Sequence, residues 1–268
     1  MKGNFYFVGT PIGNLKDFSQ NQIDTLNSVD IILCEDTRTS KTLLDKYDIH
    51  KKLLSFHKFN FKEMTPKVIS LLNDGTNIAL ISDAGLPVIS DPGRELIDDL
   101  RNNDIKYTVI GGVSAFINAY ILSGFDYPFT FIGFLPNKNT EREKLLVEFR
   151  NVKSTLIFYS SVHDINKDLE YLYSYLGDRK ICVARELTKL YEEVTFSTLK
   201  EGYKGVLKGE FVVVVEKYKE EDDDLSLEEK FDFYIKLGYS KNEAIKLVSK
   251  DKKMTKSEVY NYFMKKEK

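Results

Sequence analysis

The sequence SDAGLPVISDPG occupies residues 82–93 and directly follows an apolar run, TNIALI, at residues 76–81. The apolar run predicts a buried strand, and the glycines, prolines and aspartates after it predict a loop at the carboxyl end of that strand. Glycine lets the backbone approach a small molecule closely, proline restricts the loop, and aspartate can bind polar groups of a ligand. A tight turn selected only for its geometry would have a similar composition. The loop is therefore a candidate ligand site, but by itself it indicates no reaction.

Strand-like and helix-like patterns alternate on both sides of this loop. In the first 110 residues, strands are expected at 4–8, 31–34, 78–81 and 107–110, and helices at 19–28, 39–47, 62–73 and 93–102. This alternation is typical of a parallel sheet covered by helices.

A second series of elements follows Gly111 and Gly112, which mark the best candidate for a domain junction. Its strands are expected at 129–134, 155–159, 180–184 and 210–216, and its helices at 114–123, 141–150 and 164–176. We therefore predict an α/β fold with two α/β domains, residues 1–112 and 113–218, and a ligand cleft between them.

The C-terminal region differs in charge from the rest of the chain. An acidic run, YKEEDDD at residues 218–224, predicts a solvated linker, and residues 225–268 predict a small helical domain of three short helices. Ser240 and Thr255 are expected N-caps, each with a glutamate three residues later in the spacing of a capping box. This segment carries eleven lysines and seven acidic residues, a net charge of +4, whereas the remainder of the chain carries −6.

The basic segment fits nucleic-acid docking, because its last helix also carries Tyr260, Tyr262 and Phe263. The alternative is a packing appendage whose lysines only keep the surface solvated.

Composition excludes several other classes. The net charge of −2 over 268 residues does not indicate a polyanion-binding protein as a whole. Cys34 and Cys182 lie in apolar runs and are expected to be buried thiols. The three histidines have no metal-site spacing, so no metal is expected.

The N-terminus lacks a signal peptide, and no segment reaches the ~18 apolar residues of a membrane span. We expect a cytoplasmic protein with no membrane association.

Loops are expected at five strand ends, residues 8–14, 34–39, 82–93, 110–116 and 133–138. Because the carboxyl ends of parallel strands share one edge of a sheet, the loops of the first domain should converge there. The chain has no GxGxxG dinucleotide fingerprint, no GxxxxGK[ST] phosphate loop and no GxSxG nucleophile elbow. These patterns indicate a ligand cradle built from several loops.

Five strings occur in the order TPIGNL, CEDTRTS, ISDAGLPVISDPG, GFLP and ARELTKLYEE. Together they resemble the ribosomal RNA small subunit methyltransferase I family of the tetrapyrrole methylase-like superfamily, over about residues 5–217. The resemblance implies two α/β domains that clasp S-adenosylmethionine, a homodimer, and methylation of the ribose 2′-hydroxyl of a cytidine in the decoding region of 16S rRNA in the small ribosomal subunit.

The resemblance also implies positions for the cofactor. Its expected binding residues are Pro11, Ser82, Asp83, Ala84, Gly85, Val88, Ser114, Ala115, Tyr159 and Leu187. For two of them a structural role is the alternative, since Asp83 can cap the following turn and Ser114 can N-cap the helix that begins there.

The implied reaction needs a 2′-hydroxyl aligned with the sulfonium methyl group and a group that takes its proton. Glu35 and Asp36 are the candidates for proton acceptance or ribose positioning, and Lys189 could be the base only if its pKa were depressed. The positions expected to be catalytic are Glu35, Asp36, Arg38 and Lys189, and those expected to bind substrate are Arg185, Glu186, Lys253 and Lys256. Alternatively, Glu35, Arg38, Arg185 and Glu186 form an ion-pair network that only braces the loops.

Three positions depart from the pattern of that family. Ser160 stands where a glutamate is common, Asp164 where an arginine is common, and Ile110 where a proline usually precedes the glycine pair. The first two suggest a swapped or abandoned ion pair and argue against a catalytic role for residues 158–164. Two other functions remain open, a methylase of small tetrapyrrole-type molecules and a ribosome-binding protein without catalysis.

Overall fold

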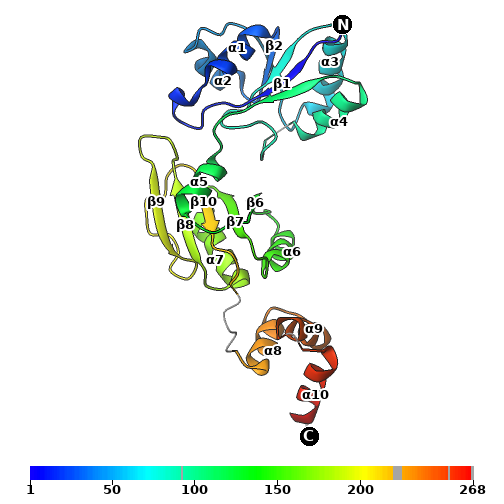
Figure 1. The fold of residues 1–268 in the computed structure, drawn as a ribbon, viewed down its shortest axis with the longest axis vertical. Helices are drawn as coiled ribbons and strands as arrows, with labels where there is room; N and C mark the ends of the chain where they lie inside the picture. The colour runs from blue at the N-terminus through cyan, green and yellow to red at the C-terminus, as the bar shows by residue number, and fades with distance from the viewer. Residues whose placement is uncertain (92, 220–224, 253, 267–268) are drawn as a thin grey trace. The chain divides into compact units, whose positions relative to one another are not determined.

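The computed structural model describes residues 1–91, 93–219, 225–252 and 254–266. The chain forms two compact units, Met1–Tyr218 and Lys219–Lys268, which we call unit 1 and unit 2. Unit 1 contains two five-stranded sheets with helices against them, as an α/β fold requires (Figure 1). No helix in the described ranges is both long and apolar enough to cross a membrane.

The first sheet is entirely parallel. Its strands, in spatial order, are β3 (Lys52–Ser55), β2 (Ile31–Cys34), β4 (Ile78–Leu80), β1 (Phe5–Val8) and β5 (Tyr107–Ile110). β2 and β4 are buried along their whole length, which explains their continuous apolar sequences. β3 was not expected from the sequence, because it is a short, partly exposed edge strand that begins with a lysine.

Helices cover both faces of this sheet. The helical segments are η1 (Leu15–Asp17), α1 (Gln20–Ser28), α2 (Thr37–Asp45), α3 (Phe61–Asn73) and α4 (Arg94–Asn102). On one face, Leu72 of α3 and Leu96 of α4 join the buried cluster around Phe5. On the other face, Leu26 of α1 and Leu44 of α2 join a second buried cluster, which includes residues of β1, β2 and β4. Because both faces are packed, the strand ends remain as the place for a polar site.

The second sheet is mixed. Its strands, in spatial order, are β6 (Phe129–Phe134), β7 (Thr155–Ser160), β10 (Phe211–Val215), β8 (Lys180–Arg185) and β9 (Glu193–Thr198). β9 was also not expected, since its sequence EVTFST is polar and only partly buried. Ala119 of α5 (Ala115–Ser123) packs into the core on one face of this sheet. Residues of α6 (Asn139–Phe149) and α7 (Ile165–Leu176) form the core on the other.

The chain crosses from the first sheet to the second through residues 111–114, between β5 and α5. The absence of side chains on Gly9 and Gly112 lets the two backbones pass close together. A Cβ atom on Gly112 would lie 3.1 Å from the Cα atom of Gly9 and 3.0 Å from Nε2 of Gln22. The crossing segment therefore passes directly against the loop that follows β1.

Unit 2 consists of α8 (Leu227–Lys236), α9 (Lys241–Asp251) and α10 (Lys256–Lys266). The expected caps are confirmed: Ser240 with Glu243 forms a capping box, and the Thr255 and Glu258 side chains make the same reciprocal contacts. Its core contains Tyr234, Ala244, Ile245, Val248 and Val259.

Two of the aromatic residues expected to face a nucleic acid instead serve the fold of unit 2. The ring centroid of Phe263 lies 4.5 Å from that of Phe231, and the Tyr262 hydroxyl donates a hydrogen bond of 2.5 Å to Glu228. The expectation was wrong for Phe263, because its ring packs against the core of the unit. Tyr260 remains 45% exposed.

Candidate active site at the carboxyl edge of the first sheet

Hydrogen bonds join the loops that follow β1 and β4. The backbone groups of Thr10 and Gly85 bond to each other at 2.8 and 3.1 Å. The buried Thr10 hydroxyl donates to the Ser82 carbonyl at 3.1 Å, and the Ser82 hydroxyl donates to the Gly85 carbonyl at 3.1 Å. Ser82 and Gly85 are therefore parts of a rigid frame.

The loop of residues 82–93 contains backbone that side chains rarely adopt. Val88 and Ser90 have φ angles of 76° and 65°. Such conformations cost free energy and persist where surrounding contacts fix them, often at functional sites. Ser90 also lies near the second sheet, because its Oγ would be 3.2 Å from a Cβ on Gly133 of β6. This loop thus reaches from the first sheet to the second.

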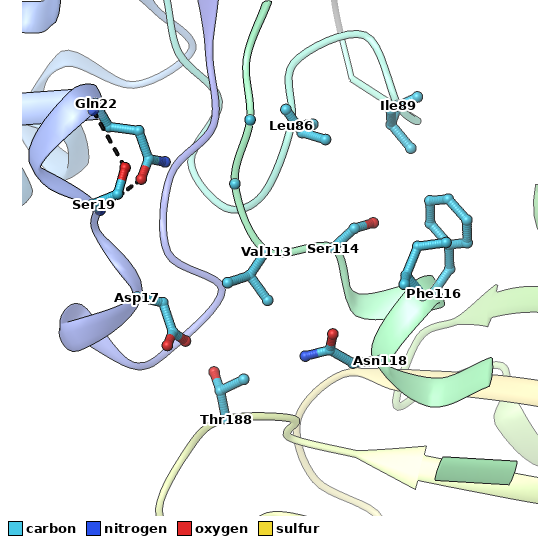
Figure 2. Close-up of a pocket in the computed structure, with 13 residues that line it drawn as sticks. Asp17, Ser19, Gln22, Leu86, Ile89, Val113, Ser114, Phe116, Asn118 and Thr188 are labelled. Carbon is cyan, nitrogen blue, oxygen red and sulfur yellow. Dashed lines mark hydrogen bonds between the residues drawn. The ribbon is translucent and has the colours of Figure 1, made fainter. Parts of the chain in front are cut away.

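A cavity of about 560 Å³ opens where the two sheets meet (Figure 2). It is lined by Asp17, Ser19, Gln22, Leu86, Ile89, Gly111, Gly112, Val113, Ser114, Phe116, Ile117, Asn118 and Thr188. Pockets for small molecules have volumes of roughly 300–1,000 Å³ and combine apolar walls with a few polar groups. The volume and lining of this cavity meet both conditions.

The buried side chain of Gln22 organises one wall of the cavity. Its Nε2 donates to the Gly9 carbonyl at 2.6 Å, and its Oε1 accepts from the Ser19 amide at 2.7 Å. The capping box that starts α1 therefore also fixes the loop after β1. The sequence analysis named neither Ser19 nor Gln22 as a site residue, although their capping-box spacing next to a glycine-rich loop could have indicated it.

Of the residues expected to bind a cofactor, Ser114 lines the cavity. Pro11 and Ser82 are buried beneath the loops. Val88 packs against the core of the first sheet and Leu187 is buried in the core of the second. The remaining positions do not line the cavity: Asp83, Ala84 and Gly85 lie in the loop after β4, Ala115 begins α5, and Tyr159 lies on β7.

Ser114 occupies the N-cap position of α5, but its side chain makes no capping hydrogen bond. Tyr159 lies nearby on β7. Burial raises the pKa of the Tyr159 phenol, whereas hydrogen bonding to the Phe116 backbone and the Ser114 side chain acts in the opposite direction. Tyr159 therefore remains a neutral phenol beside the segment where the chain crosses between the sheets.

An acidic side chain that the sequence analysis did not select is Asp91. Burial, with the carboxylates of Glu35 and Asp83 as smaller contributions, raises the pKa of Asp91 to about 6, against a hydrogen bond from Ser82 that acts to lower it. Burial also raises the pKa of Asp83, against a hydrogen bond from the Asp36 backbone. The fold thus gathers three carboxyl groups, from residues 35, 83 and 91, at the ends of β2 and β4.

Asp36 has a structural role at the start of α2. Its Oδ1 accepts from the amides of Arg38 at 2.8 Å and Thr39 at 3.5 Å. Hydrogen bonding to Arg38 and Thr39 lowers the pKa of Asp36. The Arg38 guanidinium lies 3.4 Å from Oδ2 of Asp36, yet its side chain is 92% exposed. A carboxylate held in this way is a weak proton acceptor, so the capping role is better supported than proton acceptance.

The condition under which Lys189 could serve as the base is not met. Its Nζ lies 2.8 Å from Oε1 of Glu186 and 3.2 Å from Oε2 of Glu210. Burial tends to lower the pKa of Lys189, but its hydrogen bonds and charge interactions with Glu186 and Glu210 outweigh burial and raise it. Lys189 is therefore held protonated.

Arg185 and Glu186 are parts of a bracing network. Nε of Arg185 lies 2.9 Å from Oε2 of Glu193, and Arg185 is only 8% exposed. The loop after β8 also reaches the first sheet, because the Asn14 amide donates to the Thr188 hydroxyl at 3.2 Å. For these two residues the geometry favours the bracing alternative over contact with substrate.

The two positions expected to bind substrate in the C-terminal segment belong to unit 2. Lys256 is an exposed residue at the start of α10. Lys253 lies outside the described residues.

The departures at residues 160 and 164 have local explanations. The buried Ser160 hydroxyl donates to Oδ2 of Asp168 at 2.6 Å, and Oδ1 of Asp168 lies 3.8 Å from the buried guanidinium of Arg142. Asp164 accepts from the Ser161 hydroxyl at 2.7 Å. The acidic partner of the buried Arg142 is thus Asp168 on α7, instead of a residue at position 160. Within the ranges that the structure describes, no three His, Cys, Asp or Glu side chains gather as a possible metal site.

The family of tetrapyrrole (corrin/porphyrin) methylases matches residues 4–202 of this chain. The chain belongs to the tetrapyrrole methylase family. Two similar proteins are both named ribosomal RNA small subunit methyltransferase I. The protein from Halalkalibacterium halodurans is 41% identical over 274 residues and covers 98% of this chain and 95% of its own length. The protein from Bacillus subtilis is 40% identical and covers 97% and 94%. The resemblance inferred from the sequence motifs is confirmed.

Solved structures confirm the fold class. The uroporphyrin-III-C-methyltransferase from Thermus thermophilus is 17% identical, with a TM-score of 0.58 over 81% of this chain and 95% of that one. The methyltransferase CobJ is 16% identical, with a TM-score of 0.62 over 80% and 94%. At this level of identity the similarity shows the fold alone.

Proposed function

We propose that this protein transfers a methyl group from S-adenosylmethionine to the ribose 2′-hydroxyl of a cytidine in the decoding region of 16S rRNA. The observation that carries the proposal is the identity of about 40% with two rRNA small subunit methyltransferases over nearly the full length of the chains. The cavity and the carboxyl groups at the edge of the first sheet support it.

The cavity between the sheets fits the proposed cofactor. Its apolar side chains, among them Leu86 and Ile89, suit an adenosine, and Ser114 and Gln22 offer polar groups. A Cβ on Gly111 would meet no atom within 4 Å, so the backbone there borders open space. S-adenosylmethionine supplies a methyl group on a positively charged sulfur. The task of the protein is then to align a hydroxyl group and to accept its proton.

Among the candidate groups, Asp91 has the pKa that best suits a proton acceptor. Its pKa of about 6 keeps it largely ionised at neutral pH, yet makes it a better base than an ordinary aspartate. Asp36 and Lys189 are less suitable because the pKa of the first is lowered and that of the second is raised. Glu35 and Asp83 remain as neighbours that strengthen the basicity of Asp91 and can orient the ribose.

A ribosomal substrate implies that the reaction takes place in the cytoplasm. The homodimer implied by the resemblance, and docking of rRNA by the basic unit 2, remain predictions. In unit 2, Lys230 contributes less than its charge suggests, because its side chain is 9% exposed and lies 3.2 Å from Asp251.

Methyl transfer to small ribosomal subunits that lack this modification tests the proposal. Labelled S-adenosylmethionine should label one cytidine ribose, and mapping of the nucleotide identifies it. Binding of S-adenosylmethionine is measured separately by calorimetry. Cofactor binding without transfer to the subunit or to free 16S rRNA would point instead to a small-molecule substrate, and the absence of cofactor binding to a non-catalytic protein.

A further inference from the structure

One exposed loop at the same sheet edge plays no part in the cavity or in the carboxyl cluster. Residues 56–60, FHKFN, follow β3, and we call them the FHKFN loop. Phe59 in this loop is 83% exposed, more than Phe134 at 58% or Phe196 at 61%. An isolated exposed aromatic residue is not unusual in itself. The hydrogen bonds that hold the FHKFN loop, together with the cationic side chains near it, indicate a binding role for the Phe59 ring.

The side chain of Asn60 fixes the FHKFN loop. Its Oδ1 accepts from the His57 amide at 2.8 Å, and its Nδ2 donates to the Ser55 carbonyl at 3.0 Å. The Phe59 amide donates to Nδ1 of His57 at 3.3 Å, and the two rings lie edge to face with centroids 6.0 Å apart. Phe59 is therefore presented to solvent by an ordered turn, which lowers the entropic cost of binding a partner there.

One cationic side chain lies over the exposed ring and a second lies on the neighbouring loop. Nζ of Lys58 lies 5.0 Å from the Phe59 ring centroid. Arg38, with its 92% exposed side chain, lies on the loop that follows the neighbouring strand β2. These loops emerge side by side, because Cys34 pairs with Ser55 and the Ser55 hydroxyl donates to the Glu35 carbonyl at 3.3 Å. Single-stranded nucleic acids bind surfaces that combine an exposed aromatic ring with nearby cations, through base stacking and phosphate contacts.

The position of the loop relative to the carboxyl cluster defines which nucleotide it would meet. In the sheet, β3 lies beside β2 and two strands from β4, so their ends are separated by roughly 5 and 10 Å. The cluster of residues 35, 83 and 91 lies at the ends of β2 and β4. A nucleotide next to the one whose ribose is at the cluster would therefore reach Phe59.

We propose that Phe59 is a stacking platform for the base of a nucleotide that flanks the methylated one, with Lys58 and Arg38 contacting the adjacent phosphates. This inference rests on the proposed rRNA substrate. It assigns recognition of single-stranded RNA to the first sheet of unit 1, separately from the basic unit 2.

The test uses the absence of tryptophan from this chain. Phe59→Trp places a single tryptophan at the platform, which can be excited apart from the tyrosines, and Tyr127→Trp provides a matched control. Tyr127 is 77% exposed and lies just before β6. The end of β6 that approaches Ser90, in the loop after β4, is the opposite one, at Gly133. Titration with a short single-stranded RNA of the target sequence should quench the tryptophan fluorescence of the Phe59→Trp variant by stacking and leave that of the control unchanged. RNA affinity is measured in parallel with a fluorescent label on the RNA.

Kinetics on small ribosomal subunits provide the second readout. Phe59→Leu keeps an apolar side chain but removes the aromatic face, and should raise KM for the subunit roughly 5- to 150-fold, the effect expected for loss of one stacked base. Phe59→Tyr should restore a near wild-type KM. The melting temperature, kcat and affinity for S-adenosylmethionine should be unchanged in both, since the ring is exposed and lies outside the cavity.

The outcomes separate this inference from the proposed function. If the wild-type protein methylates the subunit and Phe59→Leu has the same KM, the stacking platform is wrong and the proposed function stands. If RNA binds Phe59→Trp with wild-type affinity and without quenching, the platform is likewise wrong. If the wild-type protein transfers no methyl group to the subunit, the proposed function fails, and the fluorescence titration alone decides whether Phe59 binds single-stranded RNA.

Discussion

Replacing Asp91 with asparagine should stabilise the folded protein at neutral pH while greatly slowing methyl transfer. The carboxyl group has a pKa of about 6 in the folded protein, against 3.8 for an ordinary aspartate, chiefly because it is buried. A group whose pKa is raised by folding binds its proton more tightly in the folded state. Its stabilising contribution is therefore present at low pH and is lost as the pH rises through 6.

The size of this effect follows from the shift in pKa. A shift of about two units corresponds to ~3 kcal/mol at 1.36 kcal/mol per unit. Asp91 is only partly buried, and solvent screening reduces the contribution, so we expect about 1–2 kcal/mol. Asparagine has nearly the same shape and no charge. The difference in unfolding free energy between Asp91→Asn and the wild type should therefore grow by this amount between pH 4 and pH 7.5.

Urea unfolding at several pH values measures the difference, with Asp98→Asn as a matched control. Asp98 is 56% exposed and pairs with Arg94 at 2.9 Å on the protein surface, so its replacement should change stability by less than about 1 kcal/mol at any pH. A variant at position 91 that is less stable than the wild type at pH 7.5, with a difference that does not depend on pH, would refute the assignment of a raised pKa.

The pH dependence of methyl transfer tests whether Asp91 accepts the proton in the reaction. If ionised Asp91 accepts the proton, the wild-type rate should rise about tenfold from pH 5 to pH 7 and level off above a pKa near 6. The Asp91→Asn variant should be slower by roughly 10²- to 10⁴-fold and lose this inflection. Full activity of the variant with an unchanged profile would remove Asp91 as the acceptor and turn attention to Glu35.

Three further predictions concern the cavity and unit 2. Gly112→Ala should weaken S-adenosylmethionine binding in calorimetry, because its methyl group would lie 3.0 Å from Nε2 of Gln22 and displace the cavity wall. Asp251→Asn should destabilise unit 2 by roughly 1–3 kcal/mol, seen as lost helical signal on heating, because it weakens the ion pair with Lys230 at 3.2 Å and the hydrogen bond that Oδ2 accepts from the Tyr234 hydroxyl at 2.6 Å. Deleting residues 225–268 should weaken RNA binding in a filter assay and leave cofactor affinity nearly unchanged; equal RNA affinity would contradict the docking role of unit 2.

The sequence correctly predicted the strands and helices whose apolar residues and capping residues follow the pattern expected for that element. β2 and β6 have the expected bounds, and the N-caps of α9 and α10 carry the expected glutamate partners. β3 and β9 escaped prediction because their sequences, KLLS and EVTFST, are only partly buried and lack a strong apolar pattern. Position in the sheet did not decide the outcome, since the edge strands β5 and β6 have the predicted bounds.

The site was harder to predict, because its properties depend on contacts between distant segments. The loops carrying residues 35, 83 and 91 could be placed at one edge, but the raised pKa of Asp91 depends first on its burial and then on the nearby carboxylates of Glu35 and Asp83. Likewise, the sequence could not show that Lys189 lies between Glu186 and Glu210. The cavity depends on the close contact of Gly9 with Gly112, which no spacing rule contains.

The similarity to shorter proteins bears on where RNA is recognised. A ribosomal RNA small subunit methyltransferase I from Mycoplasmopsis pulmonis is 42% identical over 213 residues, which cover 96% of its length but 78% of this chain. It therefore lacks a counterpart for about a fifth of this chain, a share similar in size to unit 2. If a protein of that length acts on the same kind of substrate, its contacts with RNA must lie in the shared part. If the unmatched residues are those of unit 2, the proposed stacking platform at the edge of the first sheet would meet this requirement, and unit 2 would add affinity to it.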